Sequence, residues 1–304
     1  MPFLPGQEPP RSAVVLVNPG ARRGGDAIDG VLDRLRGGGV EVREAELGAP
    51  EEIERHIRDG DEKPDCAIVC GGDGSLCLAA PGLLATGVTL GILPMGTAND
   101  LARTLGIPPD LDAAADVILA GRRRRIDLGT VNGLPFFNVA SIGLSAELAR
   151  QLSGDLKRRW GRAGYALAAL RALARAERFS AAIVEGGETH RTHSMQIAVG
   201  NGRFYGGGTV VAERAAIDDG HLDLYSLEMR SVWKLALMLP SFRAGGHGAW
   251  SEVRTARGVE FEIRTATPRP VNADGELLSR TPAVFRVHPG AVEVFAPPRT
   301  AAAA

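Results

Sequence analysis

The stretch CAIVCGGDGSLCLAAPGLL, residues 66–84, runs from an apolar segment through a glycine-rich turn into a helical pattern. Two similar stretches flank it along the chain, VVLVNPGARRGG at 14–25 and LGILPMGTANDLARTLGIP at 90–108. Their apolar segments consist of small and β-branched residues, which is typical of buried strands. Three strands that each end in such a turn predict loops that converge on one ligand. Glycine turns at helix starts suit a ligand that carries phosphate.

Outward from this region, strand patterns alternate with helix patterns. Strands are expected at 12–18, 40–45, 65–70 and 89–93, and helices at 26–36, 50–58, 75–84 and 99–105. Fully apolar strands that alternate with helices predict a parallel sheet covered on both faces. Ligands of such sheets bind at the carboxyl ends of the strands, and all three glycine-rich turns lie there.

The pattern changes after Arg125. The pair Asn132-Gly133 lies between two strand-like runs and predicts a hairpin, and short strands dominate from 179 to 297. One long helix is expected between them, at about 157–177. Short strands at this spacing predict an antiparallel sheet or sandwich, with a domain boundary near residue 127. The arginines at 122–125 are expected to follow a helix and to complement its dipole.

Composition narrows the function classes. The 304 residues hold 35 basic and 36 acidic side chains, without the basic excess of a general nucleic-acid binder. Cys66, Cys70 and Cys77 have no paired spacing, which indicates a reducing cytoplasm, and the first two are expected to be buried small hydrophobes. No signal-peptide pattern and no membrane-spanning apolar run is present, so any membrane contact is expected to be peripheral.

Asp73 is unusual within the turn Gly71-Gly72-Asp73-Gly74-Ser75, which matches neither the P-loop nor the dinucleotide-binding glycine pattern. A carboxylate repels phosphate unless a cation bridges the two or the carboxylate acts on a proton. The alternative interpretation is that Asp73 caps the following helix. For Thr97, Asn99 and Asp100 the corresponding alternative is a helix cap with an acidic first turn.

Six motifs occur in one order along the chain: VNPGARRG, GGDGSL, LGILPMGTANDLARTLGIP, NVASIGLSAE, AIDDGHLDLYSLE and VNADGE. Together, over about residues 13–297, they resemble the diacylglycerol kinase catalytic-domain family, specifically its bacterial soluble lipid kinases. Gly-Gly-Asp-Gly alone is shared with nicotinamide-nucleotide kinases; the set with Gly-Thr-Ala-Asn-Asp and the late Asp-Gly-Glu is specific.

The resemblance implies an α/β fold of two domains, with the active site in the cleft between them. The nucleotide-binding parallel-sheet domain would cover 12–126 together with a returning C-terminal strand at 288–299. The β-sandwich-like, mainly antiparallel lipid-substrate domain would cover 127–287. By the family's pattern, the residues that contact ATP would be Asn18, Pro19, Gly20, Gly71, Gly72, Asp73, Gly74, Ser75, Leu76, Gly96, Thr97 and Asn99.

The resemblance also implies catalytic and metal-binding residues. Asp73 and Asp100, with Asp127, would organise a Mg²⁺-centred network near the phosphates, and Glu276 occupies the position of the proposed general base. Which of Asp73 and Glu276 deprotonates the acceptor is left open. A second, structural metal site would take the Asp219 carboxylate and the carbonyls of Ala216 and His221, although an acidic β-turn is an alternative interpretation there.

Three positions depart from the family's pattern. Cys77 and Leu78 stand where the family often has Asn-Glu, and Ser75 stands for threonine. Reduced activity is therefore one alternative. The basic helical segment 157–178 either meets anionic lipid or, as the favoured interpretation, packs on the second domain.

The sequence therefore predicts a cytoplasmic, peripherally membrane-associated lipid kinase that uses ATP and Mg²⁺. Its acceptor is a lipid hydroxyl, such as that of diacylglycerol, phosphatidylglycerol or a sphingoid-like lipid, presented at a membrane surface. No nucleic-acid partner is expected, and the oligomeric state stays open, a homodimer included. The alternatives are a nicotinamide-nucleotide kinase and a catalytically weakened lipid-binding module; a dinucleotide oxidoreductase is disfavoured because its glycine fingerprint is missing.

Overall fold

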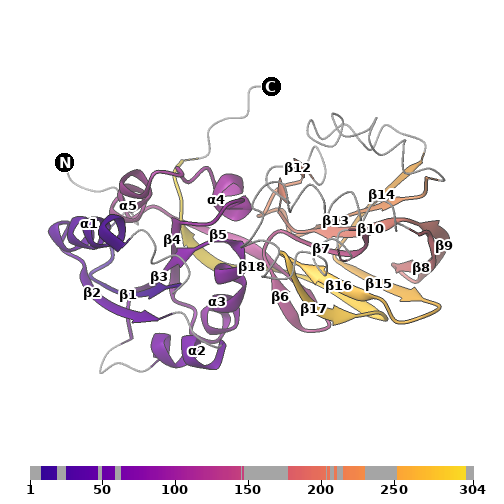
Figure 1. Ribbon diagram of the computed structural model, residues 1–304, viewed down its shortest axis with the longest axis horizontal. Coiled ribbons are helices and arrows are strands. Elements are labelled where there is room, and N and C mark those ends of the chain that lie inside the picture. The colour runs from indigo at the N-terminus through magenta and orange to yellow at the C-terminus, as the bar shows by residue number, and fades with distance from the viewer. Residues whose placement is uncertain are drawn as a thin grey trace. The chain divides into compact units, whose positions relative to one another are not determined.

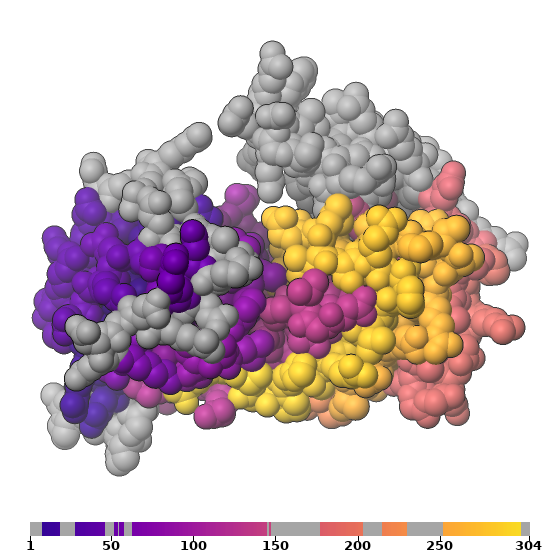
Figure 2. Space-filling view, turned by 90° about the horizontal axis from the view of Figure 1, so that it is seen from below, coloured from indigo at the N-terminus to yellow at the C-terminus, as the bar shows by residue number. Residues whose placement is uncertain are grey.

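The structure is a computed structural model that describes residues 8–18, 25–46, 50–58, 63–144, 146, 177–202, 204–205, 209–210, 215–229 and 252–298. The chain divides into two compact units. The first contains the described residues up to Asp127 and from Gly290 onward, and the second is Leu128–Pro289. Figure 1 and Figure 2 draw the described residues in colour and the others in grey.

The first unit is an α/β layer structure. Its sheet has the order β2-β1-β3-β4, and each neighbouring pair is parallel. Every residue of β3 and β4 is buried, as expected for strands with helices on both faces (Figure 1). The elements are β1 Ser12–Val17, α1 Gly25–Gly37, β2 Glu41–Glu46, α2 Pro50–Arg58, β3 Cys66–Gly71, α3 Asp73–Thr86, β4 Thr89–Pro94, α4 Asp100–Leu105 and α5 Leu111–Leu119.

The helices predicted for the first unit are confirmed, with one addition. The additional helix, α5, begins after Asp110, whose side chain accepts a hydrogen bond from the Ala113 amide at 2.9 Å. The arginine run at 122–125 follows a helix, as expected, because α5 ends at Leu119; from Arg123 onward the run also forms the start of strand β5. There the Arg123 guanidinium lies 5.6 Å from the centre of the Phe295 ring.

The cysteines behave as the sequence predicts. Cys66, Cys70 and Cys77 are free and buried. Burial raises the pKa of the Cys66 and Cys70 thiols to about 12, so both remain protonated at neutral pH. Neither thiol has the thiolate character that nucleophilic or metal-binding cysteines need, and both act as small apolar residues in β3.

The second unit is built of antiparallel strands. Among the described residues, one sheet has six strands in the order β14-β13-β10-β7-β16-β17. Facing it, β9, β8, β15 and the first part of β18 form a second antiparallel layer. The elements are β5 Arg123–Val131, β6 Leu134–Phe136, β7 Val139–Gly143, β8 Phe179–Glu185, β9 Glu188–Ser194, β10 Gln196–Gly200, β11 Phe204–Tyr205, β12 Thr209–Val210, β13 Leu222–Leu227, β14 Val253–Gly258, β15 Glu260–Thr265, β16 Pro270–Ala273, β17 Glu276–Arg280 and β18 Ala283–Phe295.

The two layers of the second unit enclose an apolar core, which includes Phe136, Ile142, Phe261 and Phe285. Alternate residues of each strand point into this core, so register decides which side chains remain for other roles. The sequence-predicted hairpin at Asn132-Gly133 is confirmed by the pairing of β5 with β6. Both of its turn residues have positive φ, as a two-residue hairpin turn requires.

The final strand, β18, begins in the second unit and ends in the first. Its early residues pair with β15, and near its end Val294 lies opposite Leu90 of β4 in a parallel arrangement. The Thr89 hydroxyl donates a hydrogen bond to Glu293 at 2.8 Å. The C-terminal strand thus extends the parallel sheet of the first unit beside β4.

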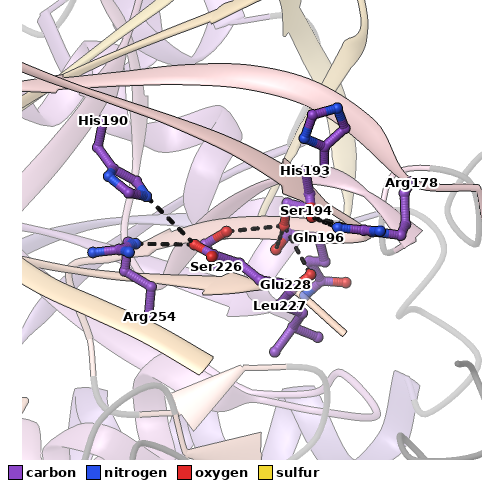
Figure 3. A network of polar contacts seen from close by, with 9 residues as sticks. All are labelled: Arg178, His190, His193, Ser194, Gln196, Ser226, Leu227, Glu228 and Arg254. Carbon is purple, nitrogen blue, oxygen red and sulfur yellow. Dashed lines mark hydrogen bonds and ion pairs between the residues drawn. The ribbon is translucent and has the colours of Figure 1, made fainter. Parts of the chain in front are cut away.

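The chain passes from one layer of the second unit to the other between β9 and β10. At this point the Ser194 hydroxyl donates a hydrogen bond to the Gln196 carbonyl at 2.7 Å. The Ser226 hydroxyl in turn donates to the Ser194 hydroxyl at 3.0 Å (Figure 3). His190 and His193 of β9 point in different directions (Figure 3). The His190 Nε2 atom lies 3.9 Å from the Glu228 carboxylate.

Candidate active site

The carboxyl ends of β1, β3 and β4 lie together because these strands are neighbours in one parallel sheet. The Asn18 side chain, after β1, donates a hydrogen bond to the Ser75 hydroxyl at 2.8 Å. The Met95 amide, after β4, donates to the Gly71 carbonyl at 2.9 Å. The loops therefore converge at one sheet edge, as the sequence predicts. Pro19 and Gly20 lie outside the described residues, as does the expected helix up to residue 176.

Two glycines allow the second and third loops to touch through their backbones. A Cβ atom on Gly72 would lie 2.9 Å from the Gly96 Cα, and one on Gly96 would lie 2.6 Å from the Gly72 Cα. Both distances are shorter than a real Cβ contact, and the obstacle is backbone that cannot rotate away. This contact leaves a surface made of peptide groups, which is the kind of surface that a phosphate group can approach closely.

Asn99 closes the third loop on itself. Its side chain accepts a hydrogen bond from the Gly96 amide at 2.9 Å and donates one to the Gly96 carbonyl at 2.8 Å. Asn99 has positive φ and makes no side-chain cap to α4, although it immediately precedes that helix. Thr97, between these two residues, is exposed. Asn99 thus shapes the loop that presents Thr97.

Asp73 caps a helix, but a different one from the helix that the sequence suggests. Its two carboxylate oxygens accept hydrogen bonds from the amides of Asp100 and Leu101, both at 3.0 Å, at the start of α4. Asp73 itself is the first residue of α3, whose cap residue is Gly72 and makes no side-chain hydrogen bond. The first turn of α3 therefore has no side-chain cap, and the second and third loops are joined through the Asp73 carboxylate.

Asp100 and Asp127 are both buried. Asp127 lies in β5, and one of its carboxylate oxygens accepts a hydrogen bond from the Gly290 amide at 2.8 Å. Within the described ranges, no group of three or more His, Cys, Asp or Glu side chains is placed to hold a metal ion. A Mg²⁺ ion bound through one of these carboxylates would complete its shell with phosphate oxygens and water, which is how proteins commonly hold it. The donor set therefore fits Mg²⁺ bound together with a nucleotide.

In the second unit, the Asp-Gly-Glu motif forms the turn between β16 and β17. Asp274 and Gly275 both have positive φ. The Asp274 carboxylate accepts hydrogen bonds from three successive amides, Phe137 at 2.6 Å, Asn138 at 3.0 Å and Val139 at 3.0 Å. It ties this turn to the segment that enters β7.

Glu276, the last residue of the motif, begins β17 and is exposed. Its carboxylate makes no hydrogen bond or ion pair with any residue that the structure describes. Glu276 therefore has the accessibility that a proton acceptor needs, and Asp274 sets the position of its backbone.

Two buried asparagines at the same sheet edge were not singled out from the sequence. The Asn201 side chain donates to the Phe137 carbonyl at 2.9 Å, and the Asn201 amide donates to the Asn138 carbonyl at 2.8 Å. Asn138 and Asn201 are each 2% exposed. Asn138 directly precedes β7 in the sequence NVASIG, and Asn201 directly follows β10 in VGNG. A polar residue at the end of an apolar strand was the signal available in the sequence.

The loop before β13 contains the three residues of the expected structural metal site. The Asp219 carboxylate accepts hydrogen bonds from the amides of Ala216 at 3.2 Å and His221 at 3.0 Å. The His221 ring nitrogen Nδ1 lies 2.7 Å from the Asp219 carbonyl oxygen. Arg257 of β14 forms an ion pair with the same carboxylate at 2.8 Å.

Two family models together match almost the whole described chain. Residues 12–131 match the diacylglycerol kinase catalytic domain, and residues 138–296 match the YegS C-terminal NAD kinase beta sandwich-like domain. The first match covers the three glycine-rich loops, and the second covers the Asp-Gly-Glu turn. The α/β fold class with a sandwich-like second part is thereby confirmed.

Individual relatives agree with the family models. A protein of Pseudomonas aeruginosa named "Probable lipid kinase YegS-like" is 34% identical over 295 residues, 94% of this chain and 95% of its own. A "Diacylglycerol kinase" of Mycobacterium tuberculosis is 32% identical over 280 residues, 89% of this chain and 90% of its own. In fold, the chain is similar to a crystal structure of a Bacillus anthracis diacylglycerol kinase, with a TM-score of 0.79, 24% identity, and coverage of 95% of this chain and 98% of that one. The chain therefore belongs to the diacylglycerol kinase family and is an enzyme of the lipid kinase type.

Proposed function

We propose that this lipid kinase uses ATP and Mg²⁺ to phosphorylate a hydroxyl group of a membrane lipid. The observation that carries the nucleotide part is the first turn of α3, which has no side-chain cap because its cap residue is Gly72 and the Asp73 side chain is turned toward α4. Helix N-termini leave N–H groups without partners inside the helix, and such groups bind phosphate. The neighbouring Gly72–Gly96 contact supplies further peptide groups at the same edge.

The proposed roles of the acidic residues in the first unit follow from their contacts. Asp73 fixes the start of α4 through two hydrogen bonds from backbone amides, which gives it a positioning role beside the proposed cation. Asp100 and Asp127 are the buried carboxylates of this unit, and a single one of them would hold Mg²⁺ together with the phosphate oxygens of the nucleotide. When bound, Mg²⁺ offsets the negative charge of the phosphates during transfer.

Glu276 is our assignment for the general base. Both oxygens of Asp73 already accept backbone hydrogen bonds, whereas the Glu276 carboxylate is exposed and has no partner among the described residues. The acceptor hydroxyl would give its proton to Glu276, its oxygen would form a bond to the γ-phosphorus, and the bond from phosphorus to the ADP oxygen would break. General bases in such positions contribute about 10²–10⁴-fold to rate.

The acceptor in this proposal is a lipid hydroxyl presented at a membrane surface, such as that of diacylglycerol, phosphatidylglycerol or a sphingoid-like lipid. Contact with the membrane would be peripheral. Among the helices that the structure describes, none is both long and apolar enough to cross a bilayer.

The experiment is the transfer of labelled γ-phosphate from ATP to a total lipid extract in detergent micelles with Mg²⁺. The matched variants are Glu276→Gln and Glu188→Gln, since Glu188 is an exposed glutamate that also begins a strand directly after a glycine turn. We expect a labelled lipid that Glu276→Gln reduces about 10²–10⁴-fold and Glu188→Gln leaves unchanged. Label on a soluble nicotinamide nucleotide, with none on lipid, would instead identify the alternative kinase class. Vesicle binding with no transfer to either acceptor would identify a lipid-binding module.

A further inference from the structure

The family resemblance implies a divalent ion at the loop that precedes β13, but the Asp219 carboxylate, the only charged donor of the implied site, is already engaged. One oxygen of Asp219 accepts from the Ala216 amide and from Arg257, and the other accepts from the His221 amide. The Asp219 carbonyl oxygen is engaged by the His221 ring. Hard divalent ions need carboxylate and carbonyl oxygens that face the ion, whereas here N–H groups point at the carboxylate. The residues present do not fit a divalent ion.

Arg257 provides the positive charge at this place. It lies in β14 directly opposite Asp223 of β13, and its guanidinium reaches Asp219 at 2.8 Å and Asp223 at 3.9 Å. The Asp219 and Asp223 side chains are only 20% and 14% exposed, so both carboxylates benefit from a fixed cation. A guanidinium is always charged and donates several hydrogen bonds in a fixed plane, which suits two nearby carboxylates.

We propose that Arg257 takes the place of the structural metal ion, so that the second unit folds and stays folded without divalent ions. A divalent ion beside the guanidinium would be repelled, which excludes the ion for as long as Arg257 is present. The proposed role of Arg257 concerns the stability of the nucleotide-free protein, so its test does not depend on whether the protein has kinase activity.

The test compares thermal unfolding of the nucleotide-free protein with a chelator, with Ca²⁺ and with Mg²⁺. The variants are Arg257→Gln and a control, Arg254→Gln, because Arg254 lies on the same strand, is similarly exposed and pairs with Glu228 at 3.0 Å. The unfolding temperature of the wild type should be the same with the chelator, with Ca²⁺ and with Mg²⁺. That of Arg254→Gln should likewise not change among the three conditions. Arg257→Gln should unfold roughly 2–4 °C lower in the chelator and regain this loss when Ca²⁺ or Mg²⁺ is added.

Two further variants make the outcome specific to Asp219. Arg257→Lys keeps the charge and should remain insensitive to divalent ions even if Arg257→Gln fails to fold. Adding Asp219→Asn to Arg257→Gln should abolish the regained response to Ca²⁺. A wild type that a chelator destabilises and Ca²⁺ or Mg²⁺ restores would overturn the proposal. So would an Arg257→Gln protein that unfolds like Arg254→Gln and ignores the ions.

Discussion

Two glycine turns, one in each unit, use an aspartate in the same way. In the first unit, Asp73 accepts two backbone hydrogen bonds from residues 27 and 28 positions later in the chain. In the second, Asp274 accepts three from residues 135 to 137 positions earlier. Each carboxylate therefore joins segments that only the fold brings together. Each also lies in a motif for which the family resemblance implies a catalytic role.

The two turns differ in what lies next to the aspartate. Beside Asp73 are peptide groups, the Gly72–Gly96 contact and the first turn of α3, which suit an anionic ligand. Beside Asp274 is the exposed side chain of Glu276. The aspartate of each motif acts as an anchor, and the neighbouring groups that each aspartate positions differ in chemistry. This difference agrees with the proposed nucleotide-binding role of the first unit and the proposed acid–base role of Glu276 in the second.

The largest expected effect on stability is that of Asp274→Ala. It removes the acceptor of three amides in a buried segment and leaves them without partners, which should cost about 3–5 kcal/mol of the free energy of unfolding. Asp274→Asn should cost clearly less, because one acceptor oxygen remains and asparagine tolerates positive φ. Urea unfolding measures both, and equal losses in the two variants would contradict the anchoring role.

Gly96→Ala tests the backbone contact of the first unit. The added Cβ would meet the Gly72 Cα at 2.6 Å, which should cost about 1–3 kcal/mol and weaken nucleotide binding. Gly30→Ala in α1 is the control, since nothing lies within 4 Å of its Cβ, and it should be neutral or stabilising by about 0.5–1 kcal/mol. Calorimetric titration with ATP and urea unfolding give the two readouts. An ATP affinity unchanged in Gly96→Ala would argue against phosphate binding at this contact.

Asp73→Ala sharpens the anchor comparison. Loss of a helix cap costs about 0.5–2 kcal/mol, less than we expect for Asp274→Ala, because only two amides lose their acceptor and α4 is short. Lipid kinase activity should fall far more than stability does, since the start of α4 moves away from the proposed phosphate site. Urea unfolding and the labelled-lipid assay on the same preparation measure the two losses. Full activity in this variant would show that the cap serves folding alone.

Glu276→Gln should have the smallest effect on stability, within about 0.5 kcal/mol, because the side chain is exposed and no described residue bonds to it. A free energy of unfolding equal to that of the wild type, together with a large loss of transfer, distinguishes a proton acceptor from an anchor. A loss of stability similar to that of Asp274→Ala would place Glu276 among the anchors.

The sequence by itself determined most elements of the first unit and the sheet edge at which their loops meet. The apolar runs before each glycine turn identify buried parallel strands, and the carboxyl ends of such strands share an edge, so the convergence of Asn18, Gly72 and Gly96 follows from local pattern. The Asn132-Gly133 hairpin was predictable for the same reason, since its turn needs two residues with positive φ. Helix α5 begins after Asp110, a cap residue of a type that a sequence pattern can show.

Only the tertiary structure decided which partners the charged residues take. Asp73 caps α4 and not its own helix because β3 and β4 are adjacent, and Asp274 meets Phe137–Val139 because β16 pairs with β7. Arg257 reaches Asp219 because the register of β13 and β14 sets it opposite Asp223. Hydrogen bonds and ion pairs act over about 3–4 Å, so a sequence pattern can show that a carboxylate is present but not which group, tens of residues away, lies within that distance.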